Sequence, residues 1–298
     1  MDALPQSATG VSEAPDERTA AVGFTAFPDS GYYVLAHEHG RLIADFGGPG
    51  DSLNPGHQHA GIFSYELSLA GRRIIVDGGT PGYAADGARQ RARGTAAHNT
   101  VRIDGENQYE VWKAFRVGRR AKVSTVCHQS GHDHAWISAA HDGYKRLGVE
   151  HRRAIAVLGG SGWVVIDWFR GRGRHRIESF LHLHPEVEIV PVEGAVNLPA
   201  IGYSLIDLTA GRFEIRDDWH SPRLGQRIPS RTLARSEEVT LEAGEGAILW
   251  AYGLLASPAS GKCIAHPEHH LIAITTPGAS WTIAAGTDGL LRITPKRA

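Results

Sequence analysis

The chain has 298 residues, of which 42% are hydrophobic and 21% are charged, and its formal net charge is −1. This hydrophobic fraction is typical of a folded protein and excludes a wholly disordered chain. A net charge close to zero gives no overall field toward nucleic acid or an anionic membrane surface, so we expect neither as a partner. The sequence contains no run of about eighteen apolar residues, so we expect no insertion into a membrane.

The first 24 residues are polar and acidic and predict a disordered tail. They lack the basic and apolar regions of a signal peptide, so the sequence shows no export signal and leaves the localisation open. Residues 25–298 predict one domain, because no repeat, low-complexity run or clear linker divides them. Cys127 and Cys263 form no C-x-x-C motif. We expect both to be free thiols, with a disulfide between them as the alternative.

Short apolar runs separated by turn residues fill most of the chain after the tail. Two strands are predicted at 31–36 and 41–46, and a series of further strands between 120 and 183 alternates with glycine-containing turns. This even spacing is typical of an antiparallel β-sandwich, and we find no amphipathic helical period longer than about three turns. The sequence therefore predicts an all-β fold. Residues 218–231 predict a long irregular loop, from which Arg223 could reach a ligand.

A strand pair is predicted in the first third of the chain. Residues 62–69 alternate apolar and polar side chains, residues 73–77 form a second apolar run, and Ala70-Gly71 between them suits a tight turn. A hairpin brings the end of its second strand back beside the start of its first. We therefore expect Asp77, at the end of this hairpin, to lie beside the residues that precede it.

Three histidines flank this hairpin. His57 and His59 precede the first strand, and His98 follows the second strand after a loop. Residues i and i+2 of an extended segment point to the same side, so His57 and His59 can face one site together. His59, Asp77 and His98 would supply two imidazoles and a carboxylate, a ligand set that suits zinc. Because the chain has 17 histidines, the alternative that these are ordinary polar residues also stands.

Arginine and aromatic side chains follow the hairpin. Residues 84–93 (AADGARQRAR) predict a short helix or a lid, whose arginines either grip the acidic groups of a sugar or lie solvated at the surface. Trp112 and Phe115 stand in an otherwise polar stretch. They either stack on a sugar ring or fill the core.

The order and spacing of these motifs resemble the C-terminal domain of the heparinase II/III-like polysaccharide lyases. The matching segments are GHQHA at 56–60, VDGGT at 76–80 with Tyr83, and RGTAAHNTV at 93–101 followed by Asp104, Gly105 and Gln108. Later segments are similar as well, at 151–153, 164–167, 182–185 and 221–225. The resemblance extends over roughly residues 25 to 295.

The resemblance implies a large antiparallel two-sheet β-sandwich. In the family this sandwich packs against an N-terminal α/α toroid of helices, for which we find no room in this chain, so we expect a toroid partner on a separate chain. The family reaction is β-elimination on a uronic-acid polysaccharide, in which a base removes the C5 proton and an acid assists the leaving sugar. We therefore expect an acidic polysaccharide as substrate, without a preference among heparin-like, alginate-like and other polymers.

The resemblance also assigns roles to residues. His57 matches the histidine of the sandwich that faces the site, and Tyr83 matches a tyrosine near it, so both are expected to be catalytic. His59, Asp77 and His98 match the ligands of a metal ion that mainly organises the site, and Zn²⁺ is the expected cofactor. The residues expected to contact substrate are Arg93, Asn99, Gln108 and Arg223.

The chain departs from the family pattern at two places. Gly61 stands where the family often has Asp, and Gly78 and Pro81 stand where it has Pro and Tyr. Glu66 or Glu106 could compensate for the missing carboxylate near the ligands. Two other functions stay open: a non-catalytic, metal-stabilised carbohydrate-binding sandwich, and a hydrolase that uses a metal-bound water.

Overall fold

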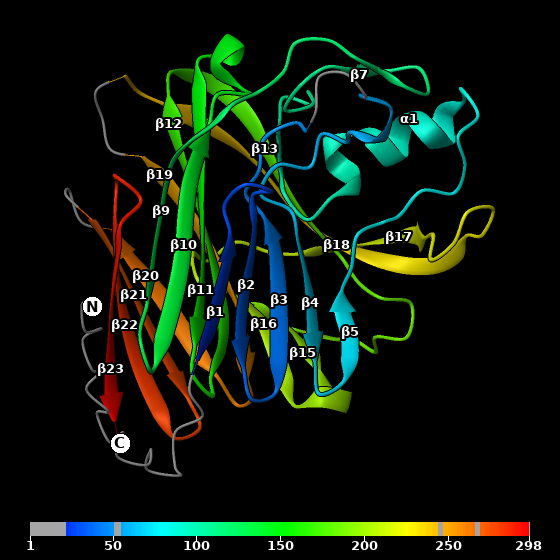
Figure 1. Cartoon of the computed structure of the whole chain (residues 1–298). Coiled ribbons are helices and arrows are strands. Elements are labelled where there is room, and N and C mark those ends of the chain that lie inside the picture. The colour runs from blue at the N-terminus through cyan, green and yellow to red at the C-terminus, as the bar shows by residue number, and fades with distance from the viewer. Residues whose placement is uncertain (1–21, 51–54, 244–246, 266–268, 298) are drawn as a thin grey trace, which may run out of the picture.

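The computed structural model describes residues 22–50, 55–243, 247–265 and 269–297, and nearly all regular structure in them is antiparallel strand (Figure 1). The prediction of an all-β fold is confirmed. Most of the predicted N-terminal tail, residues 1–21, lies outside the described residues, and the first strand begins at Gly23. None of the helices in the described ranges has the length and apolar character needed to cross a membrane.

The first sheet is a five-stranded meander in which neighbours in sequence are neighbours in space. Its strands are β1 (Gly23–Phe27), β2 (Tyr32–His37), β3 (Gly40–Asp45), β4 (Tyr65–Leu69) and β5 (Arg72–Ile75). The predicted turn at Ala70-Gly71 is confirmed: both residues have positive φ, 48° and 74°, which suits the tight turn of a two-residue hairpin. Phe63 also has a positive φ, 67°, so the chain bends before β4 and the strand begins later than predicted.

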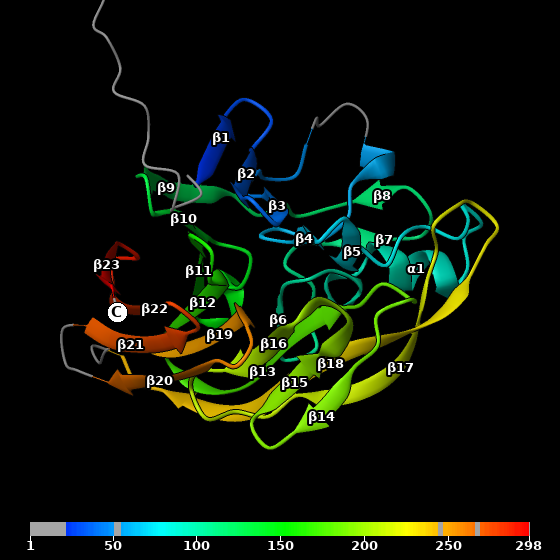
Figure 2. The same cartoon turned by 90° about the horizontal axis from the view of Figure 1, so that it is seen from below.

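The second sheet has eight strands and forms the middle of the molecule (Figure 2). In spatial order its strands are β14 (Val190–Val192), β15 (Ala195–Leu198), β16 (Tyr203–Asp207), β19 (Ile248–Ala256), β12 (Gly162–Gly171), β11 (Val149–Leu158), β10 (His134–His141) and β9 (Val123–Ser130). Its central strands are apolar on both faces. Along β12, Trp163 and Val165 face the five-stranded sheet, while Val164, Ile166 and Trp168 face the opposite side.

A third layer covers that opposite side. It is the four-stranded sheet β20 (Ser260–Ala265), β21 (His269–Thr276), β22 (Ala279–Gly286) and β23 (Leu291–Arg297). Ile272, Trp281 and Ile283 of this sheet pack against Ala154 and Ala156 of β11 in a second hydrophobic core. The predicted sandwich is therefore present, and the last sheet adds a layer to it. Cys127 and Cys263 border this core as free, half-buried thiols, as expected.

A smaller sheet lies beside the candidate site. Its strands, in spatial order, are β17 (Glu214–His220), β18 (Ile228–Leu241), β13 (Gly173–His182) and β6 (Val101–Ile103). The prediction of an irregular loop over residues 218–231 is wrong, because β17 and β18 form a hairpin whose tip is limited to 221–227. β17 is half-exposed along its length, so its polar sequence shows no apolar alternation.

The remaining elements are short. They are the α-helix α1 (Gly87–Arg93), the strand pair β7 (Val111–Trp112) and β8 (Arg116–Val117), and four 3-10 helices: η1 (Pro55–His57), η2 (Thr95–Ala97), η3 (Lys145–Leu147) and η4 (Pro199–Ile201). Helix α1 confirms the helical alternative for residues 84–93, and the side chain of Asp86 caps it by accepting from the Arg89 amide at 2.9 Å.

A buried ion pair ties the central sheet to the segments beside the site. Arg153 of β11 donates to both carboxylate oxygens of Asp167 on β12, at 2.8 and 2.9 Å, and both side chains are buried. Its remaining nitrogen donates to the carbonyl oxygens of Phe63 and Asn99 at 3.0 and 2.7 Å. His151 donates to the same carboxylate at 2.7 Å. Burial opposes the charge on Asp167, but Arg153 and these hydrogen bonds hold its pKa at about 2.

We predict that Asp167→Asn lowers the free energy of unfolding by about 3–5 kcal/mol, because it leaves the buried Arg153 guanidinium without its counter-charge. Urea titration of the purified protein measures this change. The control is Glu238→Gln, which breaks the exposed ion pair between Arg174 and Glu238 and should cost less than about 1 kcal/mol. Equal, small effects of the two substitutions would contradict the role given to the buried pair.

Candidate active site

A cavity of about 700 Å³ opens beside the five-stranded sheet, where the segments that carry the predicted site residues come together. Its described lining includes the three histidines and Asp77 of the predicted site, together with residues of β2, β3 and β4: His57, His59, His98, Tyr32, Asp45, Tyr65 and Glu66. These lining residues include three carboxylates and three histidines but no Lys or Arg.

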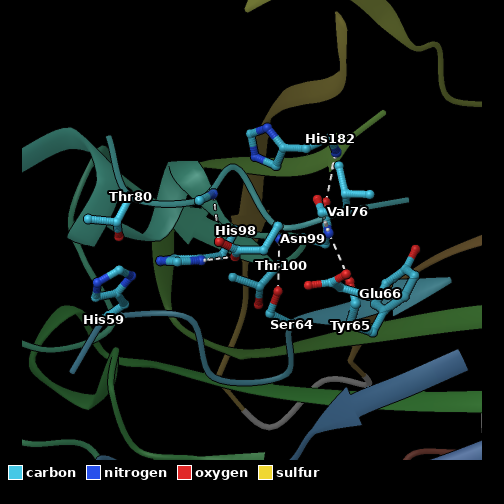
Figure 3. A network of polar contacts seen from close by, with 12 residues as sticks. His59, Ser64, Tyr65, Glu66, Val76, Thr80, His98, Asn99, Thr100 and His182 are labelled. Atoms are coloured by element: carbon cyan, nitrogen blue, oxygen red, sulfur yellow. Dashed lines mark hydrogen bonds and ion pairs between the residues drawn. The ribbon is translucent and has the colours of Figure 1, made fainter. Parts of the chain in front are cut away.

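Asn99 holds the segments around this cavity in place (Figure 3). Its amide nitrogen donates to the carbonyl oxygens of Tyr65 and Val76 at 2.8 and 2.9 Å, and its amide oxygen accepts from the backbone amide of His182 at 2.7 Å. It therefore joins β4, the segment after β5 and β13. Asn99 is fully buried, so the structure gives it a structural position in place of the predicted contact with substrate.

Gln108 has a similar position. Its side chain accepts from the backbone amide of Ile62 at 2.7 Å and donates to the carbonyl oxygen of the same residue at 3.0 Å. It also donates to the hydroxyl of Thr100 at 3.2 Å, and it is fully buried. Gln108 thus clamps the chain between His59 and β4, where no strand pairing satisfies the backbone, and it does not face the cavity.

Asp77 and His98 are in direct contact, which the hairpin argument did not predict, since it places Asp77 beside the residues that precede the hairpin. The Nδ1 atom of His98 lies 2.6 Å from Asp77 Oδ2, and the backbone amide of Gly79 donates to Asp77 Oδ1 at 2.9 Å. Burial alone would raise the pKa of Asp77, but the charge and hydrogen bond of His98 outweigh it and hold this pKa well below its usual range. Asp77 is therefore an anion that orients the His98 ring.

His59 lies beside this pair, with its ring centroid 5.3 Å from that of His98. Burial, and then the neighbouring His98, lower the pKa of His59 to about 3, so its imidazole is neutral near pH 7. An Nη atom of Arg89 lies 3.1 Å from His59 Nε2. Because guanidinium groups only donate, His59 Nε2 accepts here and its proton is on Nδ1.

The three predicted metal ligands are thus neighbours, and their donor chemistry fits a zinc-type ion. His98 Nε2 is a buried ring nitrogen without a hydrogen-bond partner among the described residues, which is the state expected of a ligand atom. In their present arrangement, however, no three His, Cys, Asp or Glu side chains of the described residues converge as a metal site. Asp77 Oδ2 is engaged by His98, and His59 Nε2 is engaged by Arg89.

Helix α1 places two arginines behind the histidines. Arg93 is fully buried, and it donates to backbone carbonyl oxygens, including those of Gln58 at 3.1 Å and Lys113 at 3.2 Å. It therefore anchors the segment that carries His57 and His59. This buried position supports a structural role in place of the predicted contact with substrate. Arg89 contacts His59 itself, which sequence reasoning missed. The signal was the spacing of four residues between Arg89 and Arg93, which puts both on one face of a helix.

Helix α1 is fixed from its other side by Asp218 of β17. Arg91 forms an ion pair with Asp218, and the hydroxyl of Thr232 donates to the same carboxylate at 2.6 Å. Burial opposes the charge on Asp218, but hydrogen bonds from His182, Thr232 and Arg91 hold its pKa well below its usual range. Sequence reasoning missed this contact because it assigned residues 218–231 to a loop.

His57 and Tyr83, the two residues predicted to be catalytic, lie in ring contact at the rim of the cavity. Their ring centroids are 5.8 Å apart and the rings are nearly perpendicular, at 84°. His57 is exposed and Tyr83 is 40% exposed, so both can reach a ligand.

Arg223 is exposed in the tip of the β17–β18 hairpin, whose Gly225 amide donates to the Pro81 carbonyl oxygen at 2.7 Å. The segment with Tyr83 and the segment with Arg223 are therefore neighbours.

Gly61 has a steric reason to lack a side chain. A Cβ atom at this position would lie 2.9 Å from Cγ of His98, closer than side chains pack.

Neither candidate for a compensating carboxylate contacts the predicted ligands: Glu66 pairs with Arg73 at 2.8 Å, and Glu106 pairs with Arg146. The carboxylate that sequence reasoning missed is Asp45 of β3. Burial raises its pKa to about 6 against the opposing hydrogen bond from the Gly47 amide.

Comparison with known proteins places this geometry in a family. The family profile described as heparinase II/III-like, C-terminal matches residues 19–258. Among solved structures, the chain is similar to a heparan sulfate lyase HepC from Pedobacter heparinus, with a TM-score of 0.67 and 14% identity. It is also similar to two heparinase III structures, with TM-scores of 0.65 and 0.64 and identities of 15% and 17%.

These similarities extend over 92%, 92% and 90% of this chain but over only 42% of each of the three structures. The chain thus spans less than half the length of the proteins that it resembles, and at these identities the likeness concerns the fold. A comparison with curated proteins finds no match.

We predict that Asn99→Ala lowers the free energy of unfolding by about 3–5 kcal/mol, because two carbonyl oxygens and one amide lose their buried partner. Asn197→Ala is the matched control. The half-buried Asn197 side chain accepts one hydrogen bond, from Ser204 at 2.8 Å, and its loss should cost about 1 kcal/mol. Urea titration with circular dichroism compares the two variants. If Asn99→Ala costs no more than Asn197→Ala, the anchoring role is wrong.

Proposed function

We propose, because this chain belongs to the heparinase II/III-like C-terminal family, that it is the sandwich part of a polysaccharide lyase that acts by β-elimination on a uronic-acid-containing polysaccharide. The observation that supports this proposal most directly is the contact between His57 and Tyr83 at the rim of the cavity. Two different proton-transfer groups, both accessible, stand beside a hollow large enough for sugar residues.

The reaction needs both kinds of group. A base removes the C5 proton of the uronate, and an acid protonates the departing sugar oxygen. An imidazole and a phenol can each carry out one of these transfers, and the perpendicular contact of the two rings places them side by side. We propose His57 and Tyr83 for these roles, and the geometry does not divide the two roles between them.

The charges that line the cavity also indicate which group a partner would have to supply. Charge develops on the uronate carboxylate as the C5 proton leaves, and the site must neutralise it. The described lining holds Asp45, Glu66 and Asp77 but no Lys or Arg. We propose that a separate α/α toroid domain supplies the neutralising group and completes the site. The partial coverage of the related lyases supports this proposal.

We further propose that His59, Asp77 and His98 hold a Zn²⁺ ion. When bound, such an ion would stabilise the arrangement of the segments around the cavity and add positive charge to it. The free Nε2 atom of buried His98 and the anionic Asp77 support the proposal. Arg89 would have to release His59 Nε2 for that atom to serve as a ligand.

A second candidate is a metal-stabilised carbohydrate-binding sandwich without catalysis. The absence of Lys and Arg from the described cavity lining favours it, because such a site can hold the hydroxyl groups of a sugar without promoting elimination. Formation of unsaturated uronate by the chain, alone or with a toroid domain, would exclude this candidate. The hydrolase alternative has no comparable observation in its favour.

We predict that His57→Ala and Tyr83→Phe each lower the rate of unsaturated-uronate formation at least about 100-fold, because each removes a proton-transfer group. The assay follows ultraviolet absorbance with heparan sulfate and alginate, in the presence of a toroid domain from the same organism. His39→Ala is the matched control, since His39 also belongs to an H-x-H pair but lies exposed in the β2–β3 turn. Unchanged rates in both variants would exclude the assigned roles.

We predict that the wild-type protein contains about one zinc per chain and that a chelator lowers its melting temperature by about 5 °C or more, because the bound ion stabilises only the folded state. His59→Ala should lose the metal and become insensitive to the chelator, while His39→Ala should match the wild type. Mass spectrometry of metals and thermal denaturation measure both effects. A metal-free wild type with no response to added zinc would remove the metal from the proposal.

A further inference from the structure

Two exposed aromatic side chains lie in ring contact beside the cavity. Phe115, between β7 and β8, and Tyr83 have nearly parallel rings, with an interplanar angle of 18° and centroids 6.1 Å apart. Phe115 is 51% exposed and Tyr83 is 40% exposed. The core-filling alternative for Phe115 is therefore wrong. We call these two rings the aromatic platform.

Arg89 supports the platform from inside the protein. Its guanidinium carbon lies 4.8 Å from the ring centroid of Tyr83 and 6.0 Å from that of Phe115. Arg89 itself is buried and is fixed by hydrogen bonds to the carbonyl oxygens of Ala114 at 3.1 Å and Gly56 at 2.8 Å. Because the cation covers the inner side of the rings, their exposed area is presented to solvent in a fixed orientation.

The platform continues the cavity outward. The Tyr83 ring meets the ring of His57, and His57 lines the cavity. A chain molecule with one unit in the cavity and the next units following it would therefore pass over the platform. The exposed faces of these nearly parallel rings are flat and apolar, which matches the face of a sugar ring, where C–H groups point outward and hydroxyl groups lie at the edge.

We infer that Phe115 and Tyr83 form a subsite that stacks a pyranose ring of the polysaccharide, next to the unit held in the cavity. The inference rests on the proposed function for the class of ligand, and it assigns to Phe115 a part in binding that is separate from proton transfer. A bound ring would remove apolar area of Phe115 from water, and losing that contact should weaken binding about tenfold.

The test compares three variants with the wild type by isothermal titration calorimetry, using an unsulfated glucuronate–glucosamine hexasaccharide and, in parallel, cellohexaose. Phe115→Leu keeps an apolar side chain but removes the flat ring, and it should weaken binding of the hexasaccharide about tenfold. Phe115→Trp keeps a flat ring and should bind within about twofold of the wild type. Ile264→Ala, an equally exposed apolar position (51%) on β20, should leave binding unchanged.

The outcomes separate the subsite from the proposed function. If the wild type binds the hexasaccharide and Phe115→Leu binds it equally well, the subsite is wrong and the proposed function stands. If Phe115→Leu keeps saccharide binding but weakens binding of a toroid domain, the surface is a protein contact and the inference is likewise wrong. If the wild type binds neither saccharide, alone or with a toroid domain, both the subsite and the carbohydrate-directed function fail. Parallel loss of cellohexaose binding would show that the platform recognises the ring face without needing a carboxylate.

Discussion

The buried ion pair between Arg153 and Asp167 is the interaction on which the site depends. A charge in the core must be paired, and Asp167 pairs with the guanidinium of Arg153. The pairing fixes this guanidinium, whose remaining nitrogen donates to the carbonyl oxygens of Phe63 and Asn99. These two residues border the irregular segments that carry the histidines, where strand ladders cannot satisfy the backbone. The central sheet thereby fixes the position of the cavity wall and, through it, the positions of the histidines.

The polar residues of the family motifs consequently divide into two groups. Arg93, Asn99 and Gln108 are buried and use their hydrogen-bonding groups on backbone atoms, whereas His57 and Tyr83 are exposed at the rim. Residue type does not distinguish these cases, because a guanidinium or an amide suits a backbone carbonyl as well as a sugar. Sequence reasoning therefore identified the motif residues but did not foresee that Arg93, Asn99 and Gln108 are buried with their hydrogen-bonding groups on backbone atoms.

The burial of apolar surface and the charges around the cavity are separate features of this domain. The sandwich buries its apolar surface in two cores, one on each face of the central sheet. Its described cavity lining, however, combines three carboxylates with three histidines and contains no Lys or Arg. Folding and the proposed binding of an acidic substrate are thus separate requirements, and our proposal assigns the neutralising charge to a group outside the described cavity lining.

The sequence by itself determined the all-β fold and the hairpin at Ala70-Gly71, because strand alternation and turn chemistry are local properties. Tertiary structure alone decided the rest. The packing of the third layer on the central sheet, the position of Arg89 on His59 and the pairing of Phe115 with Tyr83 all arise from segments distant in sequence. Their contacts follow from which faces the packed sheets bury, and no local pattern encodes that choice.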